Sequence, residues 1–254
     1  MIEIVPIPAF EDNYIWLIRH GASAIVVDPG DAVPAADYLR HHQLSLVAIL
    51  LTHHHRDHTG GAAELHRLFS APVYGPRREA IASITHPVGG SDVIDFPSLG
   101  IAFQVLDVPG HTAGHIAYYG INTLFCGDAL FACGCGRLFE GSAQQMHASL
   151  AKFSALPDDT KVCCAHEYTL ENIHFAKLVE PGNAALLERE HRDRATRSQG
   201  RPTLPSSIGL EKLTNPFLRC GEPAVIAAAS RFAGHPLVAP VDVFAAIRQW
   251  RDQV

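Results

Sequence analysis

Thr52-His53-His54-His55-Arg56-Asp57-His58 stands directly after an apolar run at residues 46–51 and shortly before the pair Gly60-Gly61. The apolar run predicts a buried strand, and the glycine pair predicts a turn into a helix. Ligands of open α/β sheets bind at the carboxyl ends of strands, where this polar stretch is expected to lie. Because imidazole nitrogens and carboxylate oxygens are donors that divalent metal ions prefer, the stretch predicts a metal site.

The spacing within the stretch separates its members. His53 and His55 are two residues apart, so in an extended chain they project to the same side. Asp57 and His58 follow after a turn and are positioned to face a second metal ion. His54 is expected to point away from the metals. The alternative interpretation is a solvated histidine-rich loop that binds no metal.

Composition excludes several classes of function. The chain has 254 residues, is 47% hydrophobic and 18% charged, and carries a net charge of -6. These values suit one compact domain, alone or with a smaller companion, and they argue against a nucleic-acid partner. No window approaches the roughly 18 unbroken apolar residues of a membrane span, and the N-terminus lacks the pattern of a secretory signal. We therefore expect a cytoplasmic, monomeric protein that does not bind membranes.

The six cysteines show no metal-binding or redox spacing. Neither Cys133-Gly134-Cys135 nor Cys163-Cys164 has the two-residue gap of zinc ribbons and thioredoxin-like motifs. Half of the cysteines lie in apolar runs, where the residue usually acts as a small hydrophobe. We expect all six to be reduced and structural.

The pattern of predicted secondary structure changes near residue 168. Short β-rich runs with turn signals between them fill the first two thirds, with helical patterns at residues 32–41, 61–69 and 143–154. Beyond residue 168, helical patterns follow at residues 170–179, 184–198, 223–232 and 241–252, with a proline-rich connector at 201–216. This order predicts a layered α/β domain followed by a helical appendage.

Three more potential metal ligands repeat the context of the first stretch. His111, Asp128 and His166 each follow a separate strand pattern. A lone histidine is more often a hydrogen-bonded core or surface residue, and His115 stays close to that interpretation. Together the strand ends supply His53, His55, Asp57, His58, His111, Asp128 and His166. A catalytic zinc needs three protein ligands and a structural one four, so seven donors favour two metal ions that share a carboxylate.

These motifs resemble those of the metallo-β-lactamase superfamily, and within it those of the glyoxalase II, or hydroxyacylglutathione hydrolase, family. The superfamily signature comprises residues 52–58, 109–115, 127–128 and 166–168. The family resemblance rests on residues 8–14, 134–141, 166–169 and 215–217 and on the helical tail. It implies a four-layered αββα sandwich with a C-terminal helical domain. Residues 1–168 would form the catalytic domain and residues 169–254 the substrate-binding domain.

The resemblance also implies roles for the ligands. His53, His55 and His111 would hold the first metal ion, and Asp57, His58 and His166 the second. Asp128 would bridge the two ions, and Asp57 and Asp128 count as catalytic. Zinc is the first expectation for both ions, with iron or manganese as alternatives. The implied reaction is hydrolysis of S-D-lactoylglutathione to D-lactate and glutathione by metal-activated hydroxide, the second step of methylglyoxal detoxification.

Substrate contacts are implied in the last part of the chain and in residues 134–141. Arg137, Tyr168, Arg248 and Arg251 would bind the glutathione moiety, whose carboxylates suit arginine. Arg248 and Arg251 are three apart on a predicted helix and therefore share a face. The family usually has lysine where Arg137 stands and often tyrosine where Phe139 stands, which puts the affinity for substrate in doubt.

Other functions on the same scaffold remain open. One is a glutathione-persulfide dioxygenase with a single iron, and another is a hydrolase of a different thioester or of a lactone. A non-catalytic metal-binding or RNA-binding module is a third. The presence of both Asp57 and His58 favours two metals, and the long helical tail favours glyoxalase II. Two bound ions would support hydrolysis, one iron the dioxygenase, and none a binding module.

Overall fold

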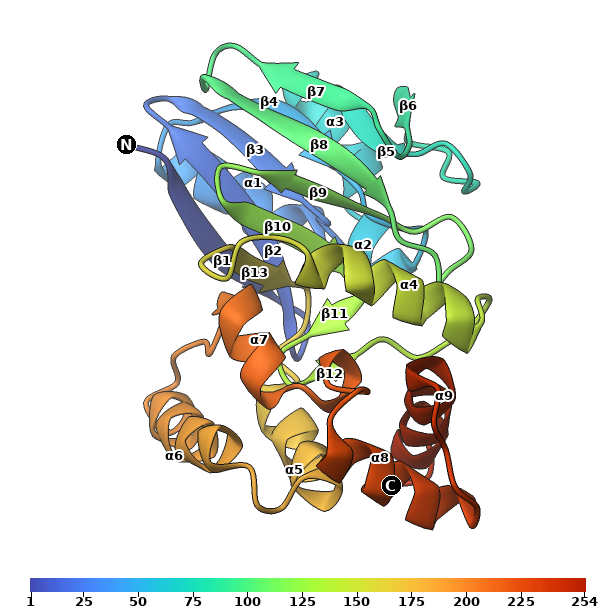
Figure 1. The fold of residues 1–254 in the computed structure, drawn as a ribbon. Helices are drawn as coiled ribbons and strands as arrows, with labels where there is room; N and C mark the ends of the chain where they lie inside the picture. The colour runs from blue at the N-terminus through green and yellow to red at the C-terminus, as the bar shows by residue number, and fades with distance from the viewer. The chain divides into compact units, whose positions relative to one another are not determined.

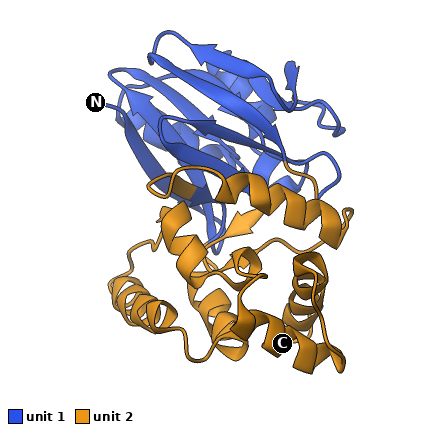
Figure 2. Cartoon of the chain, viewed as in Figure 1, with its two compact units in different colours: residues 1–107, 112–127, 163–166 blue, residues 108–111, 128–162, 167–254 orange.

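The structure is a computed structural model that describes residues 1–254. The chain forms two compact units, each assembled from several segments (Figure 2). Unit 1 comprises Met1–Asp107, Thr112–Gly127 and Cys163–His166, and unit 2 comprises Val108–His111, Asp128–Val162 and Glu167–Val254. The division of function at residue 168 stays a prediction. None of the helices combines the length and the apolar character needed to cross a membrane.

Unit 1 contains a mixed sheet whose strands follow one another in chain order (Figure 1). β1 to β3 pair antiparallel, and β3 to β6 pair parallel. Its strands are β1 (Glu3–Ala9), β2 (Asn13–His20), β3 (Ser23–Val27), β4 (Ser45–Leu50), β5 (Val73–Pro76) and β6 (His86–Val88). Because parallel neighbours need a crossover, α1 (Ala32–His41) connects β3 to β4, and α3 (Ala62–Phe69) connects β4 to β5.

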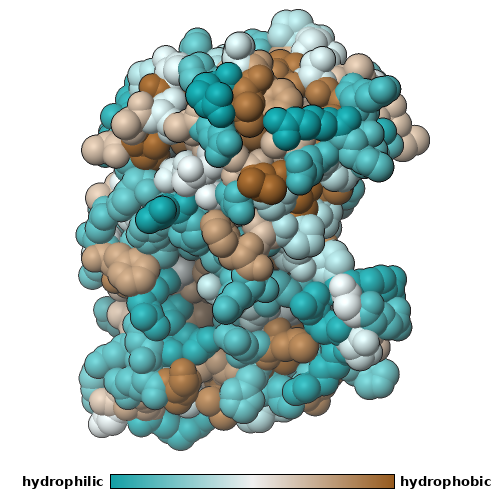
Figure 3. Space-filling view, turned by 180° about the vertical axis from the view of Figure 1, so that it is seen from behind, coloured by the Kyte–Doolittle hydropathy of each residue, from teal (hydrophilic) through white to brown (hydrophobic).

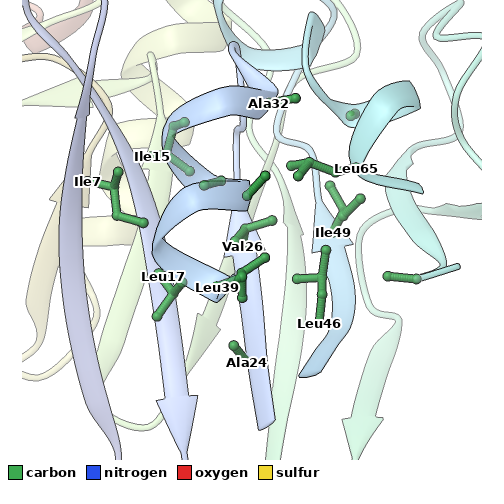
Figure 4. Packing of buried hydrophobic residues seen from close by; sticks show 14 of the residues in the cluster. Ile7, Ile15, Leu17, Ala24, Val26, Ala32, Leu39, Leu46, Ile49 and Leu65 are labelled. Carbon is green, nitrogen blue, oxygen red and sulfur yellow. The ribbon is translucent and has the colours of Figure 1, made fainter. Parts of the chain in front are cut away.

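The core under these helices explains why the strand sequences are continuously apolar. Along β2 and β3, side chains alternate between the two faces of the sheet, so Leu17 and Val26 pack in one cluster with Leu39 of α1 and Leu65 of α3 (Figure 4). Trp16, between two members of that cluster, is also buried, because a second sheet covers the other face. A sheet covered on both faces loses the polar alternation of a solvated one.

In the second sheet of unit 1, four consecutive strands form an antiparallel meander. Its strands are β7 (Val93–Phe96), β8 (Ile101–Asp107), β9 (Ile116–Gly120) and β10 (Thr123–Gly127), followed by the end of β13 (Lys161–Cys164). Two buried hydrogen bonds join the sheets: Tyr118 donates its hydroxyl to the Leu51 carbonyl at 2.8 Å, and the Trp16 indole donates to the Cys164 carbonyl at 2.9 Å. The predicted layered α/β fold is confirmed.

Unit 2 is mainly helical, with two short strand pairings. β11 (Leu130–Phe131) pairs with β12 (Gly134–Cys135), and β14 (Ser206–Ser207) pairs with Lys161 and Val162. The helices are α4 (Ala143–Ser154), α5 (Thr169–Val179), α6 (Ala184–Ser198), α7 (Ile208–Thr214), α8 (Pro223–Ala233), α9 (Pro240–Arg251) and the 3-10 helix η1 (Pro216–Leu218). Helix α7 lies in the connector at 201–216, where the sequence interpretation placed no helix.

A buried ionic network holds unit 2 together around Arg189. Its guanidinium contacts Glu211 at 2.8 Å and Asp193 at 3.2 Å, and all three side chains are at most 3% exposed. Glu211 also accepts a hydrogen bond from the backbone nitrogen of Cys133 at 2.8 Å, next to β12. The network therefore ties α6 and α7 to the loop that leads to Arg137.

Arg189→Leu is expected to lower the free energy of unfolding by about 3–5 kcal/mol, because it leaves buried carboxylates without their cation. Arg194→Leu is the matched control on the same helix. Arg194 pairs with Glu190 at 2.9 Å but is 62% exposed, so its loss should cost at most about 1 kcal/mol. Urea unfolding of both variants measures the difference, and equal losses would contradict this account of the network.

On the face in Figure 3, hydrophilic side chains predominate and apolar ones form small separate patches. Single exposed apolar residues are ordinary on protein surfaces. The distribution of apolar side chains on this face therefore does not indicate a binding surface for another protein.

Candidate metal centre

The ends of two neighbouring parallel strands bring the first group of polar site residues to one edge of the sheet. β3 ends before Asp28 and β4 ends just before Thr52 and His53, and the Asp28 backbone nitrogen donates to the Leu50 carbonyl at 2.9 Å. The short helix α2 (Arg56–Thr59) then places Asp57 and His58. A Cβ on Gly30 would lie 1.8 Å from the Asp57 carbonyl oxygen, so only glycine permits this close approach.

Asp28 orients two histidines of this edge, although the sequence analysis assigned it no role. Its carboxylate accepts from the Thr52 backbone nitrogen at 2.8 Å, from the Thr52 hydroxyl at 2.7 Å and from Nδ1 of His58 at 3.0 Å. The Thr52 hydroxyl in turn lies 3.0 Å from Nδ1 of His53. Both histidines are fully buried. With Nδ1 of each ring hydrogen-bonded, Nε2 is the nitrogen available to a metal.

His53 and His55 face one another. Nε2 of His53 lies 3.1 Å from Nδ1 of His55, which agrees with the prediction that both project to one side of the chain. His54 turns elsewhere, because its Nδ1 pairs at 3.0 Å with Glu79, whose side chain is 3% exposed. His115 is buried and stacks on His53, with ring centroids 4.6 Å apart. It therefore packs against His53 and is not one of the predicted metal ligands.

A second group of donors surrounds Asp57. Asp57, His58 and His166 each offer a ligand atom, and these atoms lie within 4.8 Å of one another. Nε2 of each histidine is 3.4 Å from Oδ2 of Asp57. Burial works to raise the pKa of the Asp57 carboxyl, but hydrogen bonds from His166 and His58 outweigh it and hold that pKa below its usual range. The carboxyl is therefore ionised at neutral pH and can serve as an anionic ligand.

The turn between β1 and β2 contributes two contacts to this group that sequence reasoning missed. Oδ1 of Asp12 lies 2.7 Å from Nδ1 of His166. Nδ2 of Asn13 donates to Oδ2 of Asp57 at 3.1 Å. Both residues fall within the segment 8–14 of the family resemblance, which was the available signal.

The remaining two donors belong to unit 2 and stand where the chain passes between the units. His111 directly precedes Thr112 of unit 1, and Asp128 directly follows Gly127. Nε2 of His111 lies 3.4 Å from Oδ2 of Asp128, and its Nδ1 donates to the Arg137 carbonyl at 2.8 Å. A Cβ on Gly136 would lie 1.9 Å from the Asp128 carbonyl, so this loop also requires glycine.

Three of the predicted substrate contacts gather around Asp252 in unit 2. Oδ1 of Asp252 accepts from Arg248 at 3.0 Å and lies 3.3 Å from Nε of Arg137. Arg251 is one residue away and reaches Glu171 at 4.0 Å. Arg248 is buried, donates to the Cys135 carbonyl at 2.9 Å, and has an Nε without a hydrogen-bond partner. Two guanidinium groups, those of Arg137 and Arg248, therefore contact one carboxylate, and Arg251 lies close enough to interact with it electrostatically.

The aromatic members of the predicted substrate site also lie in unit 2. Tyr168 precedes α5 and packs edge-on against Phe131, with ring centroids 5.3 Å apart. Phe139 is 59% exposed and contacts the ring of His111 edge-on at 5.3 Å. Phe139 therefore lies beside a predicted metal ligand but offers no hydroxyl.

Two family models together match almost the whole chain. Residues 9–166 match the family model described as Metallo-beta-lactamase superfamily, and residues 167–254 match Hydroxyacylglutathione hydrolase C-terminus. The hydroxyacylglutathione hydrolase of Nitrosomonas europaea is 56% identical over 252 residues, covering 99% of this chain and 96% of that protein. That of Thiobacillus denitrificans is 51% identical over 253 residues, covering 100% and 99%.

Among solved structures, ETHE1 from Myxococcus xanthus is similar with a TM-score of 0.65 and 26% identity, over 99% of this chain and 98% of that one. The predicted metallo-β-lactamase fold with a C-terminal helical domain is confirmed by the family matches. Because they extend through both parts of the chain, and because relatives above 50% identity cover it fully, the protein belongs to the hydroxyacylglutathione hydrolase family of thioester hydrolases within the metallo-β-lactamase superfamily.

Proposed function

We propose that this protein hydrolyses S-(2-hydroxyacyl)glutathione thioesters, S-D-lactoylglutathione in particular, with two divalent metal ions. The observation that carries the proposal is the match of residues 167–254 to the C-terminus of hydroxyacylglutathione hydrolases. The metallo-β-lactamase part alone is common to many reactions, whereas this helical part is specific to the family. D-lactate and glutathione are the expected products, which places the reaction second in methylglyoxal detoxification.

The proposed metal ligands are the seven donors that the sequence placed at strand ends. His53, His55, His111 and Asp128 would hold the first ion, and Asp57, His58 and His166 would hold the second. The family resemblance implies that Asp128 would also be shared with the second ion. The donor set fits such ions because it consists of imidazoles and carboxylates. Nδ1 of His53, His58, His111 and His166 lies within hydrogen-bond distance of an oxygen, which would leave Nε2 of each ring for a metal ion. Zinc is the first choice, although iron and manganese accept the same donors.

When bound, the ions would activate a water molecule and polarise the thioester carbonyl. The leaving thiolate resembles that of cysteine, whose thiol has a pKa of about 8.5, so its departure needs no strong general acid. A cysteine nucleophile is unsuited to the task here. Burial raises the pKa of Cys133 to about 12 and that of Cys135 to about 11, which keeps both thiols protonated near neutral pH.

The glutathione moiety would bind to Arg137, Tyr168, Arg248 and Arg251. The guanidinium groups of Arg137 and Arg248 on Asp252, with Arg251 coupled to them electrostatically, support this assignment, because a carboxylate of the substrate is the ligand that such a cationic cluster attracts. The unpartnered Nε of Arg248 adds a donor that no side chain of the cluster satisfies. A reducing compartment such as the cytoplasm suits the six cysteines, none of which forms a disulfide. The protein would act there as a monomer.

Arg251→Ala is expected to raise KM for a glutathione thioester about ten- to a hundredfold, because one charge-assisted contact contributes about 1.5–3 kcal/mol to binding. The contact is remote from the scissile carbonyl, so kcat should change much less than KM. Arg251 is a cleaner choice than Arg248, which also holds the Cys135 carbonyl. Steady-state kinetics on the glutathione thioester and on a thioester of a small neutral thiol make the measurement.

The matched control is Arg231→Ala, which removes an exposed arginine from the last turn of α8. It should leave both substrates unaffected. If Arg251→Ala impaired the neutral thioester as much as the glutathione thioester, the arginine would have a structural role, and glutathione recognition by this cluster would be wrong.

The decisive experiment for the function is an assay of S-D-lactoylglutathione hydrolysis with metal quantification on the same sample. Rapid hydrolysis with two ions per chain is the expected result. One iron per chain without hydrolysis would favour the persulfide dioxygenase, and no bound metal would favour a binding module. Either of these results would overturn the proposal.

A further inference from the structure

The turn that joins β1 to β2 lies directly against His166. Residues 10–12 form this turn between the paired residues Ala9 and Asn13. Asn13 forms an isolated antiparallel bridge with His166, and the backbone nitrogen of Tyr14 donates to the Ala165 carbonyl at 2.7 Å. Backbone hydrogen bonds therefore fix the turn beside the histidine without help from the side chains of the turn.

The Asp12 side chain contacts the nitrogen of His166 that the proposed metal ion does not use. Oδ1 of Asp12 is 2.7 Å from Nδ1 of His166, while Nε2 of the same ring lies 3.4 Å from the carboxylate of Asp57. A carboxylate at Nδ1 keeps a proton on that nitrogen and leaves the lone pair on Nε2. The Asp12 side chain is 37% exposed and the His166 side chain is 6% exposed, so a partly exposed carboxylate contacts a buried ring.

Asn13 acts on the other member of the same group. Its Nδ2 donates to Oδ2 of Asp57 at 3.1 Å and lies 3.4 Å from Nε2 of His166. An amide donor on one carboxylate oxygen restrains the carboxylate's rotation. The last residue of the turn and the first residue of β2 therefore contact two proposed ligands of the same metal ion.

We propose that Asp12 is a positioning residue for the second metal ion, acting through the tautomer and the orientation of His166. The inference rests on the proposed two-metal site. Asp12 pairs with no side chain other than His166, so a purely structural role in the hairpin has no contact to support it. Loss of such an outer partner typically lowers metal affinity about 10- to 100-fold.

The test compares Asp12→Ala, Asp12→Asn and the control Glu11→Ala. Asp12→Asn keeps an acceptor oxygen but removes the charge, and Glu11→Ala removes an exposed acid from the same turn. Each purified protein is dialysed against a graded series of chelator concentrations, and the ions per chain are counted. Cobalt titration followed by absorbance gives the affinity of each site independently of catalysis.

Asp12→Ala should keep one ion as tightly as the wild type and bind the other about 10- to 100-fold more weakly. The affinity of Asp12→Asn for the weaker ion should lie between those of the wild type and Asp12→Ala. The affinities of Glu11→Ala should match those of the wild type. The activity that Asp12→Ala loses should return when the metal concentration is raised, whereas a folding defect would not respond to metal.

Two outcomes contradict the inference in different ways. If the wild type binds two ions and Asp12→Ala binds both unchanged, or loses both together with thermal stability, the positioning role is wrong and the proposed function stands. If the wild type itself binds fewer than two ions, the two-metal proposal fails, and the role of Asp12 fails with it.

Discussion

His55→Ala is expected to lower kcat/KM for the glutathione thioester by more than about 100-fold. This exceeds the 10- to 100-fold typical of an outer-shell partner, because a proposed metal ligand is removed outright. His55 supplies Nδ1, which lies 3.1 Å from Nε2 of His53, so both rings present nitrogen to the same point. The two imidazoles that would remain for the first ion, those of His53 and His111, cannot replace that geometry. Metal analysis should find fewer than two ions per chain in the purified variant.

His54→Ala is the control, since it removes the adjacent imidazole from the same segment. The His54 ring pairs with Glu79, which also accepts a hydrogen bond from the hydroxyl of Thr112. Its loss should cost at most a few-fold in rate and leave the metal content at the wild-type value. Equal losses of metal and rate at the two positions would show that the ligand assignment within the histidine run is wrong.

Much of the framework could be predicted because strand ends are marked in the sequence. The runs before His53, Asp128 and His166 are apolar on both faces of their strands, and each stops at the first polar donor. Helices α1, α4 and α6 were predicted with the bounds that the structure has. Asp31 caps α1, and Ser142 with Gln145 forms the capping box of α4, so local chemistry fixes these helix starts.

What could not be predicted depends on contacts between distant residues. Asp28 had no predicted role in the site, and only the pairing of β3 with β4 brings it to Thr52 and His58. Asp12 reaches His166 across 154 positions of sequence. A single carboxylate carries no periodic signal, so its partner is visible only after the chain has folded.

The helix α7 was missed for a related reason. Its seven residues are too few for a clear helical period, and prolines occur on both sides. The helix is stabilised instead by the burial of Glu211 against Arg189, a contact between α7 and α6. Tertiary packing therefore determines the structure of a segment whose intrinsic helix propensity is weak.

A single substitution at Asp128 is expected to weaken the binding of both proposed ions. It is 7% exposed, and its Oδ2 lies 3.4 Å from Nε2 of His111. A carboxylate has two oxygens, and it can give one to each of two metals. Asparagine has the same shape but no negative charge and only one acceptor oxygen. Asp128→Asn therefore tests the shared role while it changes the volume of the side chain very little.

Asp128→Asn is expected to lower metal content and turnover together, with kcat/KM reduced by more than about 100-fold, beyond the effect of an outer-shell partner. Loss of the negative charge weakens both centres, so chelator resistance should fall for both ions, whereas His55→Ala should weaken mainly one. The control is Asp158→Asn in the same unit, where a 73% exposed carboxylate pairs only with Lys212. Ion counts and rates of that control should equal those of the wild type. If Asp128→Asn retained two ions and near-normal turnover, the bridging assignment would be wrong, and His111 would have to serve the first ion without a shared carboxylate.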